Sequence, residues 1–230
     1  MEPYPGRKFQ STKTYDVLIA APLIAFYAIS MAGLQPQFAV ALRMRPPWLS
    51  ALKLADLSSF VVYCALVTAL ILLRRMPVGK LKGLWPRILA LLGSTILFVL
   101  PLGQWLTRLP PVTLPPALTA LSTLLTGGGT IAELVILSWL GRSFSLMPEA
   151  RRLVTTGPYR RIRHPLYLCG IIASIGAMLQ FAQPWAFLVV LVASGLQLWR
   201  MRYEEEVLKR TFPQYADYMT RSWRLVPGLY

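Results

Sequence analysis

The chain has 230 residues, of which 55% are hydrophobic, yet it carries 24 Lys and Arg against 9 Asp and Glu, for a net charge of +15. Its mean hydropathy is +0.52, and the cations fall in the gaps between long apolar runs instead of being spread along the chain. This pattern excludes an ordinary soluble basic domain. It also disfavours a nucleic-acid-binding protein, because cations that flank membrane spans face anionic lipid headgroups.

Six apolar runs predict an all-α integral membrane protein. A helix needs about 20 apolar residues to cross roughly 30 Å of hydrocarbon. Four runs meet this requirement, at 17–33, 54–73, 88–103 and 117–140. Two shorter runs, at 166–181 and 185–199, predict a tight helical hairpin with Pro184 in the first turn of its second helix. We therefore expect six transmembrane helices, and the alternative is five spans with the last pair re-entrant.

The distribution of the cations predicts how the helices are oriented. With the N-terminus inside, 20 of the 24 Lys and Arg residues fall in the inner gaps and 4 in the outer gaps. Cytoplasmic loops of membrane proteins carry an excess of Lys and Arg. We therefore expect both termini in the cytoplasm, with the protein in a bacterial inner membrane or the endoplasmic reticulum. The first run is long for a signal peptide and no small-residue cleavage site follows it, so we interpret it as an uncleaved anchor.

Four residues within the apolar runs call for an interpretation. Cys64 and Cys169 are expected to be small buried apolar residues, and we expect neither a disulfide framework nor a metal site. Asp56 lies near the start of its run, where it favours an interfacial or capping role over a functional one. Glu133 is deeper and follows three glycines at 127–129. Those glycines predict either a packing notch beside a buried glutamate or the wall of a ligand tunnel.

A first polar motif, LVTTGPYRRIRHPLYLCG, occupies residues 153–170. Its Gly-Pro pair predicts a turn. The residue before a proline is disfavoured in a helix, so His164 should lie at the mouth of the next helix, with Tyr167 in the first turn. Gly170 would leave room one turn later. The motif therefore presents a histidine and a tyrosine together at the membrane boundary, although interfaces are in any case rich in aromatic and basic residues.

A second polar motif, RMRYEEEVL, occupies residues 200–208 directly after the last apolar run. Helical spacing places Arg200, Glu204 and Leu208 on one face. A charged pair at this depth would be partly desolvated and should face a polar cavity. By contrast, Glu206 and Arg210 read as a solvated ion pair of small energetic value. Pro213 predicts that the helix stops near residues 211–212, and that a short second helix carrying Tyr215 and Tyr218 forms a cytoplasmic lid.

Together these motifs resemble the isoprenylcysteine carboxyl methyltransferase family of membrane enzymes that use S-adenosylmethionine. The resemblance depends on G-P-Y-x(4)-R-H-P-x-Y-x-x-G, then R-x-x-x-E-E-x-x-L, then F-x-x-Y-x-x-Y and R-L-V-P, and covers about residues 140–230. The apolar runs predict an N-terminal bundle of four spans at 1–140, which the resemblance does not cover. Residues 141–230 would form a cofactor-binding methyltransferase region of one structural unit, with the hairpin and the lid.

The resemblance also implies roles for individual residues. Arg200 and Glu204 fall on catalytic positions. The implied cofactor-binding residues are Tyr159, His164, Tyr167, Gly170, Glu205, Tyr215 and Tyr218. The implied cofactor is S-adenosylmethionine, and no metal is expected. One departure concerns the lid, because Phe212-Pro213 stands where the family has Phe-Gly.

A lipophilic carboxylate is the acceptor that best suits these residues. A carboxylate is already ionised at neutral pH, so it needs no general base, and an arginine such as Arg200 can align it through paired hydrogen bonds. The same architecture also serves phospholipid N-methyltransferases and thiol S-methyltransferases, which would need a base. A sterol-reductase-like enzyme that uses NADPH and a non-catalytic membrane protein are further alternatives. The sequence leaves the acceptor and the oligomeric state open.

Overall fold

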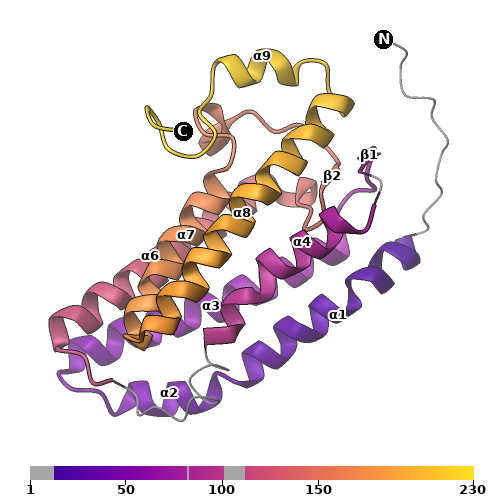
Figure 1. Ribbon diagram of the computed structural model, residues 1–230. Coiled ribbons are helices and arrows are strands. Elements are labelled where there is room, and N and C mark those ends of the chain that lie inside the picture. The colour runs from indigo at the N-terminus through magenta and orange to yellow at the C-terminus, as the bar shows by residue number, and fades with distance from the viewer. Residues whose placement is uncertain (1–12, 82, 101–111) are drawn as a thin grey trace.

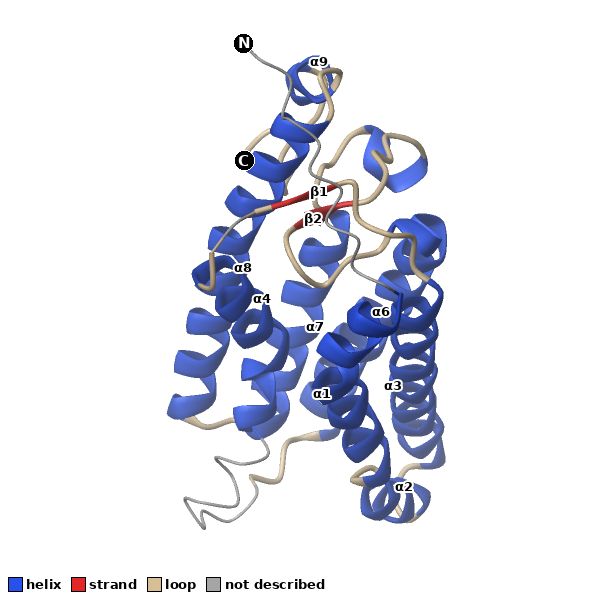
Figure 2. Cartoon of the chain, turned by 90° about the vertical axis from the view of Figure 1, so that its right-hand side faces the viewer, coloured by secondary structure: helices blue, strands red, loops and turns tan. Residues whose placement is uncertain are grey.

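The computed structural model describes residues 13–81, 83–100 and 112–230, and these form a helical bundle with one very short strand pair (Figure 1). The helices are α1 (Lys13–Ala32), α2 (Gln35–Leu42), α3 (Pro47–Leu73), α4 (Trp85–Thr95), α6 (Pro116–Leu140), α7 (Pro165–Phe181), α8 (Pro184–Thr211) and α9 (Tyr215–Thr220). Single 3-10 turns occur at η1 (Ile96–Phe98), η2 (Gly141–Ser143) and η3 (Gly157–Arg160). The strands β1 (Gly79–Lys80) and β2 (Glu149–Ala150) pair in antiparallel fashion and lie against α8 (Figure 2).

The described parts of all six predicted apolar runs are helical. Within the described residues, four helical stretches are long and apolar enough to cross a membrane: Ala21–Leu42, which joins the end of α1 to α2, and Pro47–Leu73, Pro116–Ser143 and Pro184–Thr211. The shorter α7 and α4 correspond to the other two runs, and the end of the third run, at 101–103, lies outside the described residues. These helices indicate an integral membrane protein, while the count of six spans stays a prediction.

Prolines mark where the helices begin. A proline occupies one of the first two positions of α2, α3, α4, α6, α7 and α8, where its missing N–H would have no helical partner anyway. The predicted hairpin is present, since α7 ends at the left-handed Ala182 (φ 49°) and α8 begins at Pro184. As Pro213 predicts, α8 stops at Thr211. No sequence pattern indicated α2, and α3 begins seven residues before the apolar run that predicted it.

Two of the three glycines of α6, Gly127 and Gly129, contact neighbouring helices. A Cβ atom on Gly129 would lie 2.8 Å from the Cβ of Ala173 in α7, and one on Gly127 would lie 3.4 Å from Asp56 in α3. Gly128 faces open space, because a Cβ atom there would have no neighbour within 4 Å. A Cβ atom would fit at Gly127 in ordinary contact, whereas at Gly129 it would force α6 and α7 apart. The glycines therefore form the packing notch that was one of the two interpretations of this segment.

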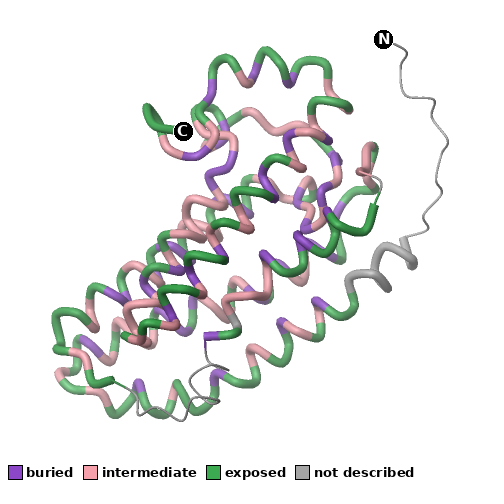
Figure 3. The backbone as a smooth tube through the Cα atoms, viewed as in Figure 1, coloured by how far each residue is buried: buried purple, intermediate pink, exposed green. Residues whose placement is uncertain are grey.

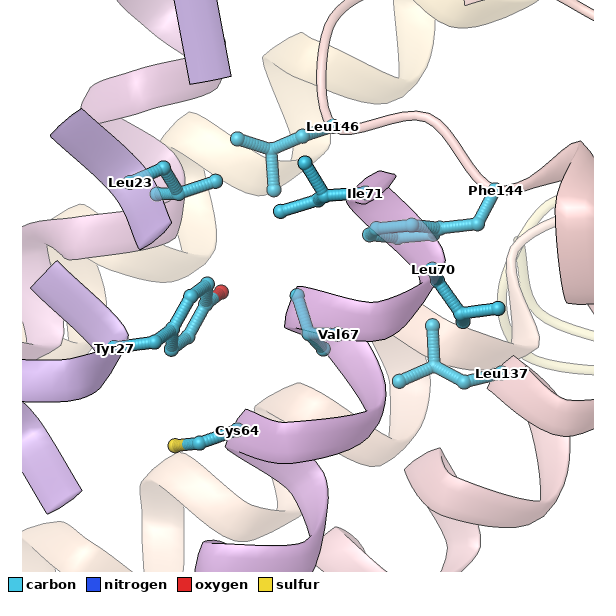
Figure 4. Packing of buried hydrophobic residues seen from close by; sticks show 9 residues of the cluster. All are labelled: Leu23, Tyr27, Cys64, Val67, Leu70, Ile71, Leu137, Phe144 and Leu146. Atoms are coloured by element: carbon cyan, nitrogen blue, oxygen red, sulfur yellow. The ribbon is translucent and has the colours of Figure 1, made fainter. Parts of the chain in front are cut away.

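A core of buried apolar residues joins α1, α3 and α6 to the loop after η2 (Figure 4). It contains Leu23, Tyr27, Cys64, Val67, Leu70, Ile71, Leu137, Phe144 and Leu146. Cys64 is fully buried as expected, but the expectation for Cys169 was wrong, because that side chain is only partly buried. Exposed positions recur along all the long helices (Figure 3). Many of the exposed residues are large and apolar, among them Val62, Val135 and Leu188. A large number of exposed apolar side chains on long helices is typical of a surface that contacts lipid.

Candidate active site

The turn before α7 places His164 and Tyr167 side by side. The chain turns at Gly157, which has φ 59° and lies against the Trp139 ring, so a side chain there would be both strained and blocked. His164 precedes Pro165 in a non-helical conformation (φ −126°, ψ 55°), as the proline rule predicts. Its ring is 5% exposed and its centroid lies 5.5 Å from that of Tyr167. The first motif thus presents its two aromatic groups at the mouth of the helix, as expected.

Arg200 of α8 is buried and holds Glu204 in place. The guanidinium Nε donates to Glu204 Oε1 at 3.0 Å, and the other two nitrogens donate to Ser94 Oγ (2.9 Å) and to the Leu146 carbonyl (2.6 Å). The guanidinium also lies 5.3 Å from the centre of the Tyr167 ring. An arginine has five N–H donors, so two remain beyond these three contacts. Arg200 is therefore fixed on three sides by the protein.

Glu204 is the carboxylate on which the two motifs converge. It accepts hydrogen bonds from Arg200 and from the Tyr167 hydroxyl, and His164 Nδ1 lies 4.0 Å from its Oε2. Its side chain is 20% exposed, in contrast to 7% for Arg200. Two of its acceptor sites are thus occupied by the protein, while part of the carboxylate is accessible. An ionised group in this setting can attract a cation or accept a further hydrogen bond.

Glu205 has a different environment, although it is the next residue. Successive helical residues point about 100° apart, and Glu205 is 2% exposed. It accepts hydrogen bonds from Arg163 Nε (2.9 Å) and Arg224 Nη2 (2.6 Å), and its Oε1 lies 3.3 Å from His164 Nε2. Its neighbours are thus two arginines and the histidine. Glu205 therefore orients His164 from the side away from the cavity. Through Arg224 it also links α8 to the chain near the C-terminus.

The C-terminal segment, which we define as residues 212–230, is hydrogen-bonded to the turn before α7. The backbone N–H of His164 donates to the Arg224 carbonyl at 3.0 Å, and the N–H of Trp223 donates to the Arg161 carbonyl at 2.8 Å. The Tyr218 hydroxyl donates to the Tyr159 carbonyl. Burial raises the pKa of Tyr218 to about 12, so this phenol stays a proton donor at neutral pH. Despite the departure at Phe212-Pro213, α9 places Tyr218 against the first motif, with the Tyr215 ring 5.7 Å from that of Tyr218.

One cavity of about 620 Å³ contains most of these groups on its wall, which is within the usual range for a small-molecule site. Of the nine predicted site residues, the structure places eight on this wall: Tyr159, His164, Tyr167, Gly170, Arg200, Glu204, Tyr215 and Tyr218. Glu205 does not line it. Glu133 does, and its Oε1 lies 3.0 Å from the position of a Cβ on Gly170, so that glycine leaves room for the acid. The glycines of α6 therefore fit the packing-notch interpretation, while Glu133 lies on the wall of a cavity, as the tunnel interpretation expects.

The cavity also reaches residues that the motifs did not indicate. It follows α7 from Tyr167 in the first turn to Phe181 at the end, and it touches Tyr27 of α1, Lys53 of α3 and Ser94 of α4. These residues come from the N-terminal helices, whose sequence resembles no family motif. Only the spatial pairing of Ser94 with Arg200 reveals its place in the site. Within the described residues, no group of three or more His, Cys, Asp or Glu side chains could hold a metal ion.

The chain is similar in sequence to known membrane methyltransferases. Residues 116–215, from α6 to the start of α9, match the family model described as phospholipid methyltransferase. The chain is 33% identical over 110 residues to Protein-S-isoprenylcysteine O-methyltransferase B of Arabidopsis thaliana, across 43% of this chain and 54% of that protein. The resemblance to the isoprenylcysteine carboxyl methyltransferase family is confirmed.

Two further similarities complete the comparison. Over 83 residues the chain is 37% identical to the nickel-cobalt-cadmium resistance protein NccN of Alcaligenes xylosoxydans xylosoxydans, across 35% of this chain and 38% of that protein. The chain thus spans between about a third and a half of the length of these curated relatives. A solved structure of the eukaryotic intramembrane Ras methyltransferase ICMT aligns with 95% of this chain and 88% of its own, with 19% identity and a TM-score of 0.45. The matched region of the family model contains every predicted site residue except Tyr218.

Proposed function

We propose that this protein is a membrane methyltransferase that transfers a methyl group from S-adenosylmethionine to a lipophilic acceptor, most simply a carboxylate. The observation that carries this proposal is the convergence of His164, Tyr167, Arg200 and Glu204 on one end of a cavity that follows the length of α7. The match of residues 116–215 to a methyltransferase family model supports it, because this region supplies all four side chains.

The side chains at this end of the cavity fit S-adenosylmethionine. When bound, the cofactor supplies a methyl group on a positively charged sulfur. Aromatic faces and a carboxylate are the groups that hold such a cation in proteins. Tyr159, Tyr167 and Tyr215 line this end, and Glu204 is the partly accessible acid among them. We therefore assign Glu204 and these tyrosines to the sulfonium, with His164 beside them.

Arg200 has the right environment to orient an acceptor carboxylate. It is buried, it is held by Ser94 and Leu146, and two of its N–H donors remain beyond its contacts with the protein. An ionised carboxylate gives up no proton, so the chain does not need to supply a base. It needs to align the acceptor and to exclude water. The C-terminal segment would exclude water by closing the cavity from the side of α9. In this role Arg200 acts on the acceptor, and Glu204 acts on the cofactor.

The positive-inside distribution supports placing this end of the cavity at the cytoplasmic face, with both termini inside. A polar cofactor then has access from the cytoplasm. The acceptor's apolar part remains in the bilayer and reaches the cavity between helices. The same reasoning retains six spans, with α4 and α7 as the short ones.

A phospholipid amine is the second candidate acceptor, because the matching family model is described as phospholipid methyltransferase. An amine must lose a proton in the reaction. His164 would be the group to accept it, since the imidazole is buried beside both glutamates. An acceptor of this kind would make turnover depend on a neutral His164, whereas a carboxylate acceptor would not.

Calorimetric titration of the purified protein tests the proposal. S-adenosylhomocysteine should bind to the full-length protein in detergent, and NADPH should not. His164→Ala should weaken binding of the methyl donor while the far-ultraviolet circular dichroism stays that of the folded protein. Lipid extracts incubated with isotopically labelled methyl donor would then identify the acceptor by mass spectrometry. Tight binding of NADPH instead, or an unchanged cofactor affinity in the histidine variant, would contradict the assignment.

A further inference from the structure

The far end of the cavity carries a second polar group of residues, remote from the methyltransferase motifs. Lys53 Nζ donates to Asp56 Oδ2 at 2.8 Å and to Gln180 Oε1 at 3.0 Å. Gln180 Nε2 in turn donates to Thr126 Oγ1 at 3.0 Å. We call these four residues, from α3, α6 and α7, the distal polar cluster. All four line the same cavity as Arg200 and Glu204.

The separation of the two ends follows from the helix that joins them. Tyr167 and Gln180 are the cavity-lining residues near the two ends of α7. At 1.5 Å per residue, they are roughly 20 Å apart along the axis. Half of the bilayer's hydrocarbon core is roughly 15 Å thick. A ligand that contacts both ends must therefore be longer than the hydrocarbon thickness of one leaflet.

The wall between the two ends offers little to a polar ligand. Ala173, Ala177 and Leu97 lie along it. Thr130 and Ser174 also line this stretch, but their hydroxyl groups donate to carbonyl groups of their own helices. Glu133, beside Gly170, and Gln197, three residues before Arg200, line the cavity as well and extend its polar end near Arg200 by about one helical turn. Beyond Glu133 and Gln197 the wall is mainly apolar as far as the distal polar cluster, which matches a long apolar chain with a polar group at each end.

The charges of the distal polar cluster define the kind of group it can bind. Asp56 is 6% exposed and neutralises Lys53, so the pair has no net charge to offer an anion. An ammonium has three N–H donors, and two of those on Lys53 are used by Asp56 and Gln180 among the described residues. The third suits an uncharged oxygen acceptor. A pair that served only to join helices would not need to face the cavity.

We propose that the distal polar cluster binds a hydroxyl or carbonyl group at the far end of the acceptor, so that this protein selects lipophilic molecules that are polar at both ends. The inference rests on the proposed function, which assigns methyl transfer to the end of the cavity lined by Arg200 and Glu204. The far-end contact itself requires no turnover, so the two proposals can fail separately.

Titration of the full-length protein in lipid nanodiscs, against empty nanodiscs as blank, tests this inference. The two probes are hexadecanoic acid, whose extended chain matches the separation, and ω-hydroxyhexadecanoic acid. The hydroxylated acid should bind about tenfold more tightly, the effect of one hydrogen bond to a charged group. Lys53→Met should abolish the preference while retaining affinity for the plain acid. Arg43→Met, which removes an exposed cation near the same end of the bundle, should retain the preference.

Further variants guard against loss of folding, because Lys53→Met leaves Asp56 buried without its partner. Lys53→Met combined with Asp56→Leu removes both charges, and Gln180→Leu removes the neighbouring amide. Both should lower the preference for the hydroxylated acid. The inference is wrong if the natural chain binds neither acid, if it binds both equally, or if the preference survives in the double variant. Absence of S-adenosylhomocysteine binding, measured separately, would overturn the proposed function and leave a measured preference intact.

Discussion

Glu204→Gln gives the sharpest test of which charge meets the cofactor. Glutamine keeps the size of the side chain and an oxygen that can accept from Arg200 and Tyr167, so the change removes mainly the negative charge. S-adenosylmethionine carries a positive sulfur, while S-adenosylhomocysteine has a neutral one in the same position. The variant should therefore lose affinity for the methyl donor and keep affinity for its demethylated product.

The size of this loss follows from the site. Two unit charges about 4 Å apart attract each other by about 4 kcal/mol at an effective dielectric constant of about 20. Arg200 already offsets part of the carboxylate's charge, and the Glu204 side chain is 20% exposed to screening. We take about a third of the attraction, about 1.4 kcal/mol, which is about a tenfold loss of affinity.

Both dissociation constants are measured by calorimetry on the same protein preparations. Glu206→Gln is the matched control, because Glu206 pairs with Arg210 at the same helical spacing but on the exposed side of α8. It should leave both constants unchanged. The reasoning is refuted if Glu204→Gln weakens both ligands equally, or if it leaves the ratio of the two constants at its natural value.

Three further changes test the surrounding structure. Arg200→Leu should lower kcat for methyl transfer more than it lowers cofactor affinity. Steady-state kinetics and calorimetry measure the two effects, and a larger loss of cofactor affinity would show that Arg200 serves only the cofactor. Glu205→Gln should weaken the attachment of the C-terminal segment by leaving Arg163 and Arg224 without their charge partner, at a cost of about 3 kcal/mol. Limited proteolysis should then cleave that segment faster, and an unchanged cleavage rate would contradict this. Gly129→Ala should destabilise the bundle by about 1–3 kcal/mol through its clash with α7, whereas Gly128→Ala should not; equal melting temperatures for the two would disprove the packing role.

The sequence predicted the helices well where apolar length and proline placement agree. The hairpin of α7 and α8 and the stop before Pro213 follow from local rules on proline. The short α2 was missed because its eight residues lack both length and a long apolar run. The strands β1 and β2 were missed as well, since two residues each carry no periodic pattern and pair only across a long stretch of chain.

The candidate site was predictable from its motifs only in part. Helical spacing correctly joined Arg200 to Glu204. It could not tell which of two adjacent glutamates faces the cavity, because that depends on how α8 rotates against α7. Ser94 and Lys53 were missed for a different reason. Each is an ordinary residue whose role arises only from what a distant helix places beside it.

The cavity-lining face of α7 has a consequence for acceptor length. Gly170 and Ala177 both line this face and lie about two helical turns apart, roughly 10 Å. Each is small, so a bulky side chain at either of them would shorten the cavity to a different depth. If the cavity binds the proposed acceptor, a larger residue at either position should reduce the longest acceptor chain that fits, and each position should set a different limit.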